Sequence, residues 1–142
     1  MSNVNSNVAS HIVMQKQSDA GTLHFFNHIA VVELNEGLHV DLNSGRQTIH
    51  DLMNYFGKTS PFGLIANRIN SYSISLLEIM VVKLILPNMV VYGVVSHNET
   101  GRMNAKIENN FCVSRNTSFD NIYEGLGTVY SKVMHQLNLT LN

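Results

Sequence analysis

The spacing of apolar side chains changes along the chain, and this change predicts the order of its elements. Residues 11–17 are expected to form a short strand, and residues 25–34, rich in β-branched and aromatic side chains, a longer one. Residues 38–42 alternate between apolar and polar side chains, which also predicts a strand. The Asp-Ala-Gly at 19–21 and the Asn-Glu-Gly at 35–37 are expected to be the turns that end these strands.

A helical period replaces the alternation in the next segment. One apolar stripe with the spacing i, i+3, i+4, i+7 consists of Ile49, Leu52, Met53 and Phe56. Ser44 and Gln47 have the spacing of a capping box at the start of this helix, and Gly57 is expected to end it. The segment is therefore predicted to be an amphipathic helix that covers a sheet.

Further along, apolar runs of strand length alternate with runs of helix length. Residues 62–66 and 89–95 are continuous apolar runs of the kind found in buried parallel strands. Residues 74–86 are apolar nearly all round, which predicts a helix buried on more than one side. A weaker helix is expected at 99–109 and a short edge strand at 111–113.

The last helix is expected to begin near Ser118. Its single apolar stripe consists of Ile122, Leu126, Val129, Val133 and Leu137. Gly125 and Gly127 lower the helix propensity of this segment, which indicates close packing against a neighbouring element.

The order of elements predicts one domain of the α/β class. The opening strands are followed by helix, strand, helix, strand and helix, so we expect a mixed sheet of about five strands with helices packed on it. The first strand should pair antiparallel and the later strands parallel. A chain of 142 residues has the size of one domain. Residues 1–10 are expected to be a flexible polar arm and residues 11–142 the domain itself.

Composition narrows the classes of partner. Hydrophobic residues make up 44% of the chain, as in globular proteins, and charged residues only 13%, with a net charge of −1. The basic residues are scattered singly, which argues against nucleic acid and anionic lipid as partners. The longest apolar region, 74–95, is interrupted by Glu78, Lys83 and Pro87, so no membrane span is expected. A single cysteine and no signal-peptide pattern predict a cytoplasmic protein.

From about residue 25 to residue 137 the order of elements resembles the STAS domain, the fold of anti-sigma-factor antagonists and of sulfate-transporter tails. The chain is most similar to a bacterial STAS-like branch of that class. Four segments carry the resemblance: Glu-Leu-Asn-Glu-Gly-Leu-His-Val-Asp at 33–41, Pro-Phe-Gly at 61–63, Asn-Arg-Ile-Asn-Ser-Tyr-Ser at 67–73 and Ala-Lys-Ile-Glu at 105–108. The segment at 67–73 is the most specific of them.

The resemblance implies a regulatory or protein-interaction module. Anti-sigma antagonists are controlled by phosphorylation of a serine or threonine at the start of the helix that follows the third core strand. Their motif there is Asp-Ser, then Ser or Thr, then Gly. This chain has Asn-Ser-Tyr-Ser-Ile at 70–74, so the aspartate and the glycine of the motif are missing.

The segment 67–75 is the first candidate site. It is expected where the carboxyl end of a strand meets the amino end of a helix, which is the usual ligand position in an open α/β sheet and favours an anion such as phosphate. The residues expected to bind a partner or ligand are Asn67, Arg68, Asn70, Ser71, Tyr72 and Ser73. The alternative is structural, because Ser75 and Glu78 have the spacing of a capping box and the serines then only complete the helix.

Glu33, His39 and Asp41 form a secondary candidate. If residues 35–37 are a three-residue hairpin loop, Glu33 lies opposite His39, with Asp41 on the same face, and the cluster makes a pH-sensitive contact. In a STAS-like fold the chain instead continues past the glycine at 37 and the pairing does not form. We favour this second interpretation, in which His39 is a polar residue at the end of a strand.

No metal site, cofactor or catalytic centre is expected. His24 and His28 share one face of a strand, and together with His39 and Asp41 they would be enough ligands for a metal ion. However, the sequence lacks the closely spaced Cys or His residues of a zinc motif. The sequence also lacks a nucleophile elbow, a phosphate-binding glycine loop and a dinucleotide fingerprint. Cys112 lies between apolar neighbours, which is typical of inert packing.

These observations predict a non-catalytic regulatory or protein-interaction module of the STAS-like type. The helix at 74–86 has more apolar side chains than one sheet can cover: Leu76, Leu77, Met80, Val81, Leu84 and Ile85. A homodimer, another protein partner or a small ligand would cover the remainder. The alternative function is therefore a carrier or sensor of a small apolar or amphipathic ligand held between the sheet and this helix. An enzyme without a recognisable motif is the third.

Overall fold

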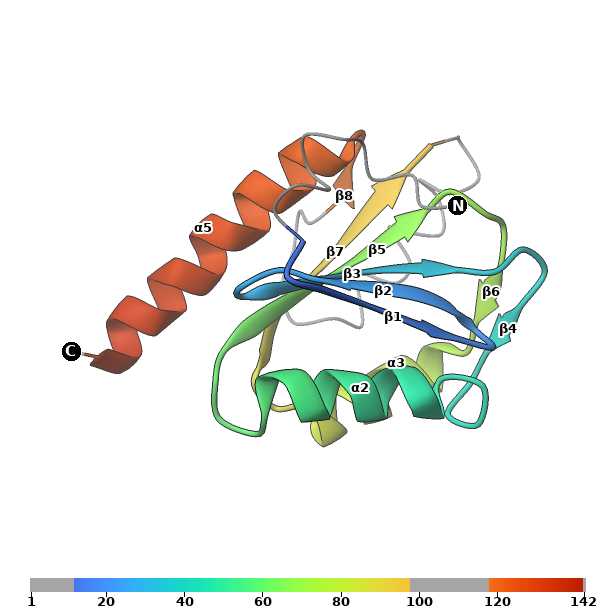
Figure 1. Ribbon diagram of the computed structural model, residues 1–142, viewed down its shortest axis with the longest axis horizontal. Helices are drawn as coiled ribbons and strands as arrows, with labels where there is room; N and C mark the ends of the chain where they lie inside the picture. The colour runs from blue at the N-terminus through green and yellow to red at the C-terminus, as the bar shows by residue number, and fades with distance from the viewer. Residues whose placement is uncertain (1–11, 98–117, 142) are drawn as a thin grey trace.

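In the computed structural model, residues 12–97 and 118–141 are described, and they form a mixed β-sheet with helices on both faces (Figure 1). The strand order is β1-β2-β3-β5-β7-β8. The six strands are β1 (Met14–Ser18), β2 (Gly21–Phe25), β3 (Ile29–Leu34), β5 (Phe62–Arg68), β7 (Met89–Ser96) and β8 (Ser118–Phe119). The pairs β1–β2 and β2–β3 are antiparallel, whereas β3–β5, β5–β7 and β7–β8 are parallel. The predicted α/β class is confirmed, as is the change from antiparallel to parallel pairing.

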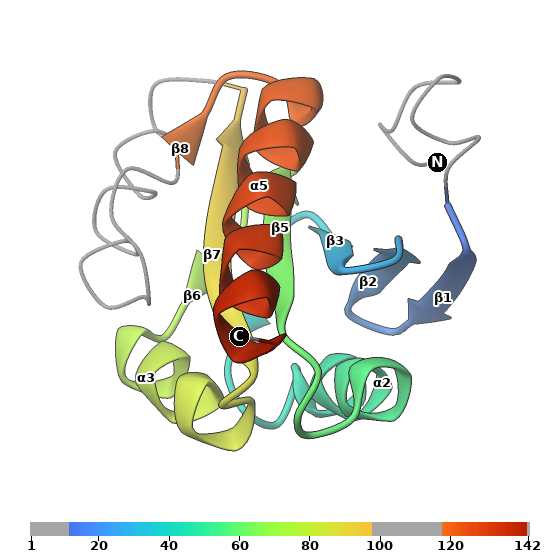
Figure 2. The same cartoon turned by 90° about the vertical axis from the view of Figure 1, so that its left-hand side faces the viewer.

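The helices cover the two faces unequally. They are α2 (Arg46–Phe56), α3 (Leu76–Ile85) and α5 (Ile122–Leu141). Helices α2 and α3 lie side by side on one face, and α5 crosses the other face (Figures 1 and 2). A separate two-stranded parallel sheet, β4 (His39–Val40) with β6 (Ser73–Ile74), lies beyond the carboxyl ends of the central strands, where α2 and α3 begin.

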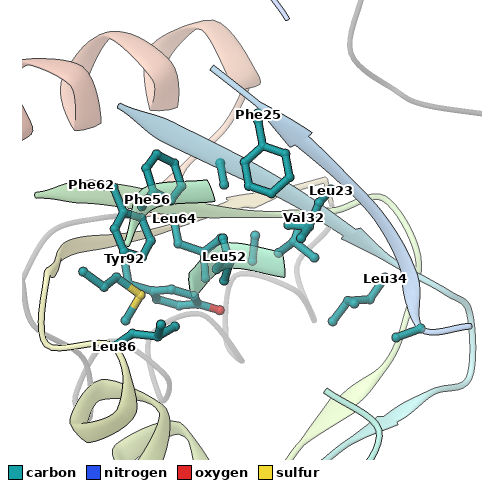
Figure 3. Packing of buried hydrophobic residues seen from close by; sticks show 14 of the residues in the cluster. Leu23, Phe25, Val32, Leu34, Leu52, Phe56, Phe62, Leu64, Leu86 and Tyr92 are labelled. Carbon is teal, nitrogen blue, oxygen red and sulfur yellow. The ribbon is translucent and has the colours of Figure 1, made fainter. Parts of the chain in front are cut away.

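Apolar side chains fill both faces of the sheet. Successive residues of a strand point to opposite faces, so in β3 the side chain of Val32 packs with α2 and α3, whereas that of Val31 packs with α5. Figure 3 shows the first of these clusters, in which the rings of Phe56 and Phe62 stack with centroids 4.2 Å apart. Burying one such ring completely contributes about 1.5–3 kcal/mol to stability.

The single strand predicted at 25–34 is wrong. The chain turns at residues 26–28, where the N–H of Phe26 donates to the carbonyl of Ile29 at 2.8 Å, and β2 and β3 form a hairpin. Phe26 is itself buried on the α5 face of the sheet. Asn27 and His28 interrupt the apolar run at the turn, and the general enrichment of residues 25–34 in apolar side chains obscures this local signal of a reversal. The predicted strand at 38–42 is reduced to the two residues of β4.

The predicted capping boxes do not form as expected. The N-cap of α2 is Gly45, and the helix has no side-chain cap hydrogen bond. The hydroxyl of Ser44 instead accepts from the backbone N–H of Asp41 at 2.9 Å, because a serine can satisfy a local turn as readily as a helix end. Ser75 is the N-cap residue of α3, again without a side-chain cap bond. Gly57 ends α2 with a positive φ of 72°, as predicted.

The carboxyl-terminal helix begins later than predicted, because Ser118 and Phe119 form β8 and α5 starts at Ile122. Its apolar stripe is confirmed, with Val129 and Val133 completely buried. Gly125 packs closely, since a Cβ atom there would lie 3.2 Å from the ring of Phe119.

The predicted close packing is wrong for Gly127, where a Cβ atom would meet nothing within 4 Å.

Five predictions fall outside the described residues: the arm at 1–10, the helix at 99–109, the segment 105–108, the strand at 111–113 and the packing of Cys112. Within residues 12–97 and 118–141, no helix is long and apolar enough to cross a membrane.

Candidate functional site

A partly open cavity of about 110 Å³ lies between the sheet and its two adjacent helices. The side chains of Val32, Leu64, Met89 and Tyr92 line it from the sheet. Leu52 lines it from α2 and Val82 from α3. Nearly all of these side chains are apolar, so the interior of the cavity is suited to an apolar molecule.

Small residues account for the space. Ala20, at the turn between β1 and β2, and Ala66, in β5, both line the cavity, and each contributes only one methyl group. Their neighbours on the same face of the sheet are bulky, as Figure 3 shows for Leu34 and Leu64. Two helices that rest on the bulky neighbours leave a gap above the alanines.

One end of the cavity is polar. It is lined by Asp41, Ser44, Gly45, Thr48 and Ser75, and both α2 and α3 begin here. Because neither helix has a side-chain cap bond, the N–H groups of their first turns point toward this end without a capping side chain. This end also lies at the carboxyl side of the parallel strands, which is where open α/β sheets usually bind ligands.

Asp41 is the charged residue of this end. Its carboxylate accepts a hydrogen bond of 2.8 Å from the backbone N–H of Ser44. This bond lowers the pKa of Asp41 below the ordinary value of 3.8, and partial desolvation opposes it only in part. Asp41 therefore carries a negative charge at neutral pH.

The predicted site segment 67–75 is tied to the chain between β3 and α2. The N–H of Ser73 donates to the carbonyl of Leu38 at 2.9 Å, and its hydroxyl lies 2.6 Å from Nδ1 of His39. The backbone N–H of Ser71 donates to the carboxylate of Glu36. These contacts form the parallel pair of β4 and β6, so the segment builds one end of the cavity.

Asn70 and Arg68 both have internal partners. The side-chain amide of Asn70 donates to the carbonyl of Leu34 at 3.0 Å. The guanidinium of Arg68 is buried, donates to the carbonyl of Tyr72 at 2.9 Å and lies 4.1 Å from the centre of the Tyr72 ring. Tyr72 in turn lines the cavity. Arg68 thus holds a residue of the cavity in place through a hydrogen bond and a cation–π contact.

Asn67 and Glu33 belong to a polar cluster on the opposite, α5-facing side of the sheet. Oε1 of Glu33 lies 3.0 Å from Nε2 of His24, and its Oε2 accepts a hydrogen bond of 2.9 Å from the amide of Asn67. Nε2 of His97 lies 2.8 Å from Oδ1 of Asn67. Nδ1 of His24 is buried and has no hydrogen-bond partner among residues 12–97 and 118–141. The six residues predicted as one site are therefore divided between the two faces of the sheet.

Of the secondary candidates, Glu33 is separated from the other two, whereas His39 and Asp41 remain neighbours and His39 helps to lower the pKa of Asp41. The chain continues past Gly37, and the hairpin that would pair Glu33 with His39 does not form. His39 is exposed and contacts Ser73, while Asp41 contacts Ser44. Among the described residues, no group of three or more His, Cys, Asp or Glu side chains is placed to hold a metal ion.

Sequence reasoning missed two parts of this arrangement. The first is the contribution of α2 to the cavity, through Thr48, Ile49 and Leu52. A sequence signal for unfilled space is Ala66, a small residue in a strand of mostly larger side chains. His24 was considered only as a metal ligand. Glu33, a carboxylate inside the apolar strand β3, is the sequence signal for a buried polar partner such as His24.

No protein-family model matches the chain, and no curated protein or solved structure matches it. The resemblance to STAS domains therefore stays a prediction, and the function has to be inferred from the geometry of the site.

Proposed function

We propose that this chain is a non-catalytic binding domain that carries or senses a small apolar or amphipathic molecule in the cavity between the sheet, α2 and α3. The observation that carries the proposal is the cavity itself, about 110 Å³ lined almost entirely by apolar side chains. Atoms that line an empty space lose van der Waals contacts, and an apolar ligand restores them. Ligand binding would thus stabilise the fold.

The volume sets the size of the molecule. An apolar cavity of about 150 Å³ engineered in another protein binds benzene. A cavity slightly smaller than that accepts one ring or a short chain, and its partial opening leaves room for a polar group at the end near Asp41 and Ser75. A few polar groups at one end of an apolar pocket are the usual means of orienting a ligand.

The first test is thermal unfolding of the full chain with and without toluene. At ten times the dissociation constant, a ligand that binds only the folded state stabilises it by about 1.4 kcal/mol. For a domain of this size we expect the melting temperature to rise by about 3–5 °C. Thr48→Phe, which fills the cavity from α2, should abolish the rise.

The matched control is His50→Phe, on the same helix but exposed and outside the cavity. This variant should keep the full response to toluene. An equal response in both variants, or no response in the unmodified chain, would contradict the proposal.

A second candidate is the regulatory or protein-interaction module of the STAS-like type. The observation in its favour is the outer surface of α3, where Val81, Leu84 and Ile85 have exposed fractions of 37%, 80% and 38%. In this proposal α3 and the adjoining segment 67–75 form the surface that binds a second copy or another protein. An anion or phosphate near the N-terminus of α3 would change the affinity.

A further inference from the structure

The polar end of the cavity combines two positive helix ends with one negative side chain. Gly45 and Ser75, the N-cap residues of α2 and α3, both line it. Each helix N-terminus is equivalent to roughly half a positive charge. Asp41, whose pKa is lowered by the backbone N–H of Ser44, adds one negative charge at the same place. The helix ends and the Asp41 carboxylate have opposite signs, so their effects on a charged ligand oppose one another.

The rest of the cavity offers no partner for an ion. Asp41 is the only charged residue among those that line it in the described part of the chain. Arg46, the first residue of α2, is exposed and does not line the cavity. An ionised group that enters an apolar site loses its hydration, and this loss is large unless an opposite charge replaces the water.

An uncharged polar group meets suitable partners at the same end. A hydroxyl or carbonyl oxygen could accept hydrogen bonds from first-turn N–H groups of α2 and α3, because neither N-cap residue makes a side-chain cap bond. A ligand hydroxyl could also donate to the carboxylate of Asp41, whose two oxygens have about four lone-pair sites and already accept hydrogen bonds from Ser44 and Asn43. Neither interaction requires a net charge on the ligand.

We infer that the cavity selects uncharged molecules, namely a ring or short chain about the size of benzene that ends in one hydroxyl or carbonyl group. A carboxylate is disfavoured because it would lose its hydration and be repelled by the negative charge of Asp41. An ammonium group is disfavoured because it would lose its hydration and be repelled by the positive ends of two helices. This inference rests on the proposed function, since it names the class of ligand for the same cavity.

Three probes with one ring and different charges test the inference: benzyl alcohol, benzoate and benzylamine. Each is titrated into the full chain at pH 7, and binding is followed by the chemical shifts of the backbone amides. Benzyl alcohol should bind at least about tenfold more tightly than either ion, which is the effect of one unpaired charge in such a site. If either ion binds as tightly as the alcohol, within about threefold, the inference is wrong although the proposed function stands.

Asp41→Asn separates the two electrostatic contributions. Asparagine keeps an acceptor for the N–H of Ser44 but removes the negative charge that opposes the two helix N-termini. The affinity for benzoate should therefore rise by about tenfold. The affinity for benzyl alcohol should stay the same. Asp51→Asn, which removes the same charge from α2 outside the cavity, should change neither affinity. Equal effects of both variants would overturn the assignment of Asp41. If none of the three probes binds the unmodified chain, the proposed function fails with it.

Discussion

Glu33 is a carboxylate in the middle of the sheet, and its partners explain how the fold tolerates it. Its exposed fraction is 5%, and it contacts His24 on β2 and Asn67 on β5. His97, directly after β7, extends the cluster through Asn67. A buried ionisable group is stable only when its hydrogen-bonding capacity is met in this way. The cluster therefore joins β2, β3, β5 and the end of β7.

Glu33→Ala should strongly destabilise the protein. The substitution leaves His24 and Asn67 buried without their common acceptor, and breaking such a buried pair lowers the free energy of unfolding by about 3–5 kcal/mol. Urea unfolding of both proteins measures the difference.

Glu124→Ala is the control for the Glu33 variant, because Glu124 is exposed in the first turn of α5. Its loss should not exceed about 1 kcal/mol, the usual size of a charge effect at a helix end. Similar losses for the two substitutions would show that the buried cluster contributes little.

The residues predicted as a ligand site illustrate what spacing alone reveals. Asn67, Arg68 and Ser73 were identified correctly as polar residues at the junction of a strand and a helix. Their hydrogen-bond partners described above lie thirty or more positions away, with the exception of the contact between Arg68 and Tyr72. Spacing along the chain carries no information about such partners. Whether these residues also contact a ligand or protein stays a prediction.

Close contact between α5 and β5 depends on one glycine of the strand. A Cβ atom at Gly63 would lie 2.3 Å from a methyl carbon of Val129 and 3.3 Å from one of Val133. Both valines are completely buried, so neither has space to move away. The position of α5 on the sheet is therefore set by the absence of a side chain at residue 63.

Gly63→Ala and Gly127→Ala should have opposite effects on stability. The first forces α5 away from β5 and should lower the free energy of unfolding by about 1–3 kcal/mol. The second adds a methyl group in open space on α5 and should raise it by about 0.5–1 kcal/mol, because alanine favours a helix more than glycine does. Thermal unfolding of the two variants and the unmodified chain measures both effects. A loss at Gly127 as large as that at Gly63 would contradict the packing described here.

At the scale of the whole molecule, α3 has the most exposed large apolar side chain of the described residues. Leu84 is 80% exposed and lies between the exposed residues Val81 and Ile85. If this surface binds a second copy, the unmodified chain should elute as a dimer in size-exclusion chromatography with light scattering, and Leu84→Glu as a monomer. The folded monomer should be nearly unaffected, since substitutions of exposed residues change stability by about 0.5 kcal/mol or less.

Val13→Glu is the matched control for Leu84→Glu, because Val13 is also apolar and 57% exposed but lies next to β1. This variant should remain dimeric. A monomeric unmodified chain, or a dimer that Leu84→Glu leaves intact, would argue against the interaction module and would leave the cavity as the basis of function.

The local pattern of the sequence determined most of the elements. The helices at 46–56 and 76–85, the strands at 62–68 and 89–96 and the buried stripe of α5 all follow from apolar spacing, because that spacing reflects which side of an element is buried. The pattern also determined the mixed sheet, since short turns allow only antiparallel neighbours and helical crossovers bring parallel ones. It failed at residues 26–28, where Asn27 and His28 interrupt an otherwise apolar segment and the chain turns while Phe26 stays buried.

Only the tertiary structure decided where the cavity lies. The cavity arises from what β3, β5, β7, α2 and α3 leave unfilled around Ala20 and Ala66, and its polar end arises because two helices begin at the same place. A volume left between elements depends on how they pack against one another, and residues far apart in the chain contribute to it. No local spacing encodes that volume, whereas the side of each element that must be buried is encoded residue by residue.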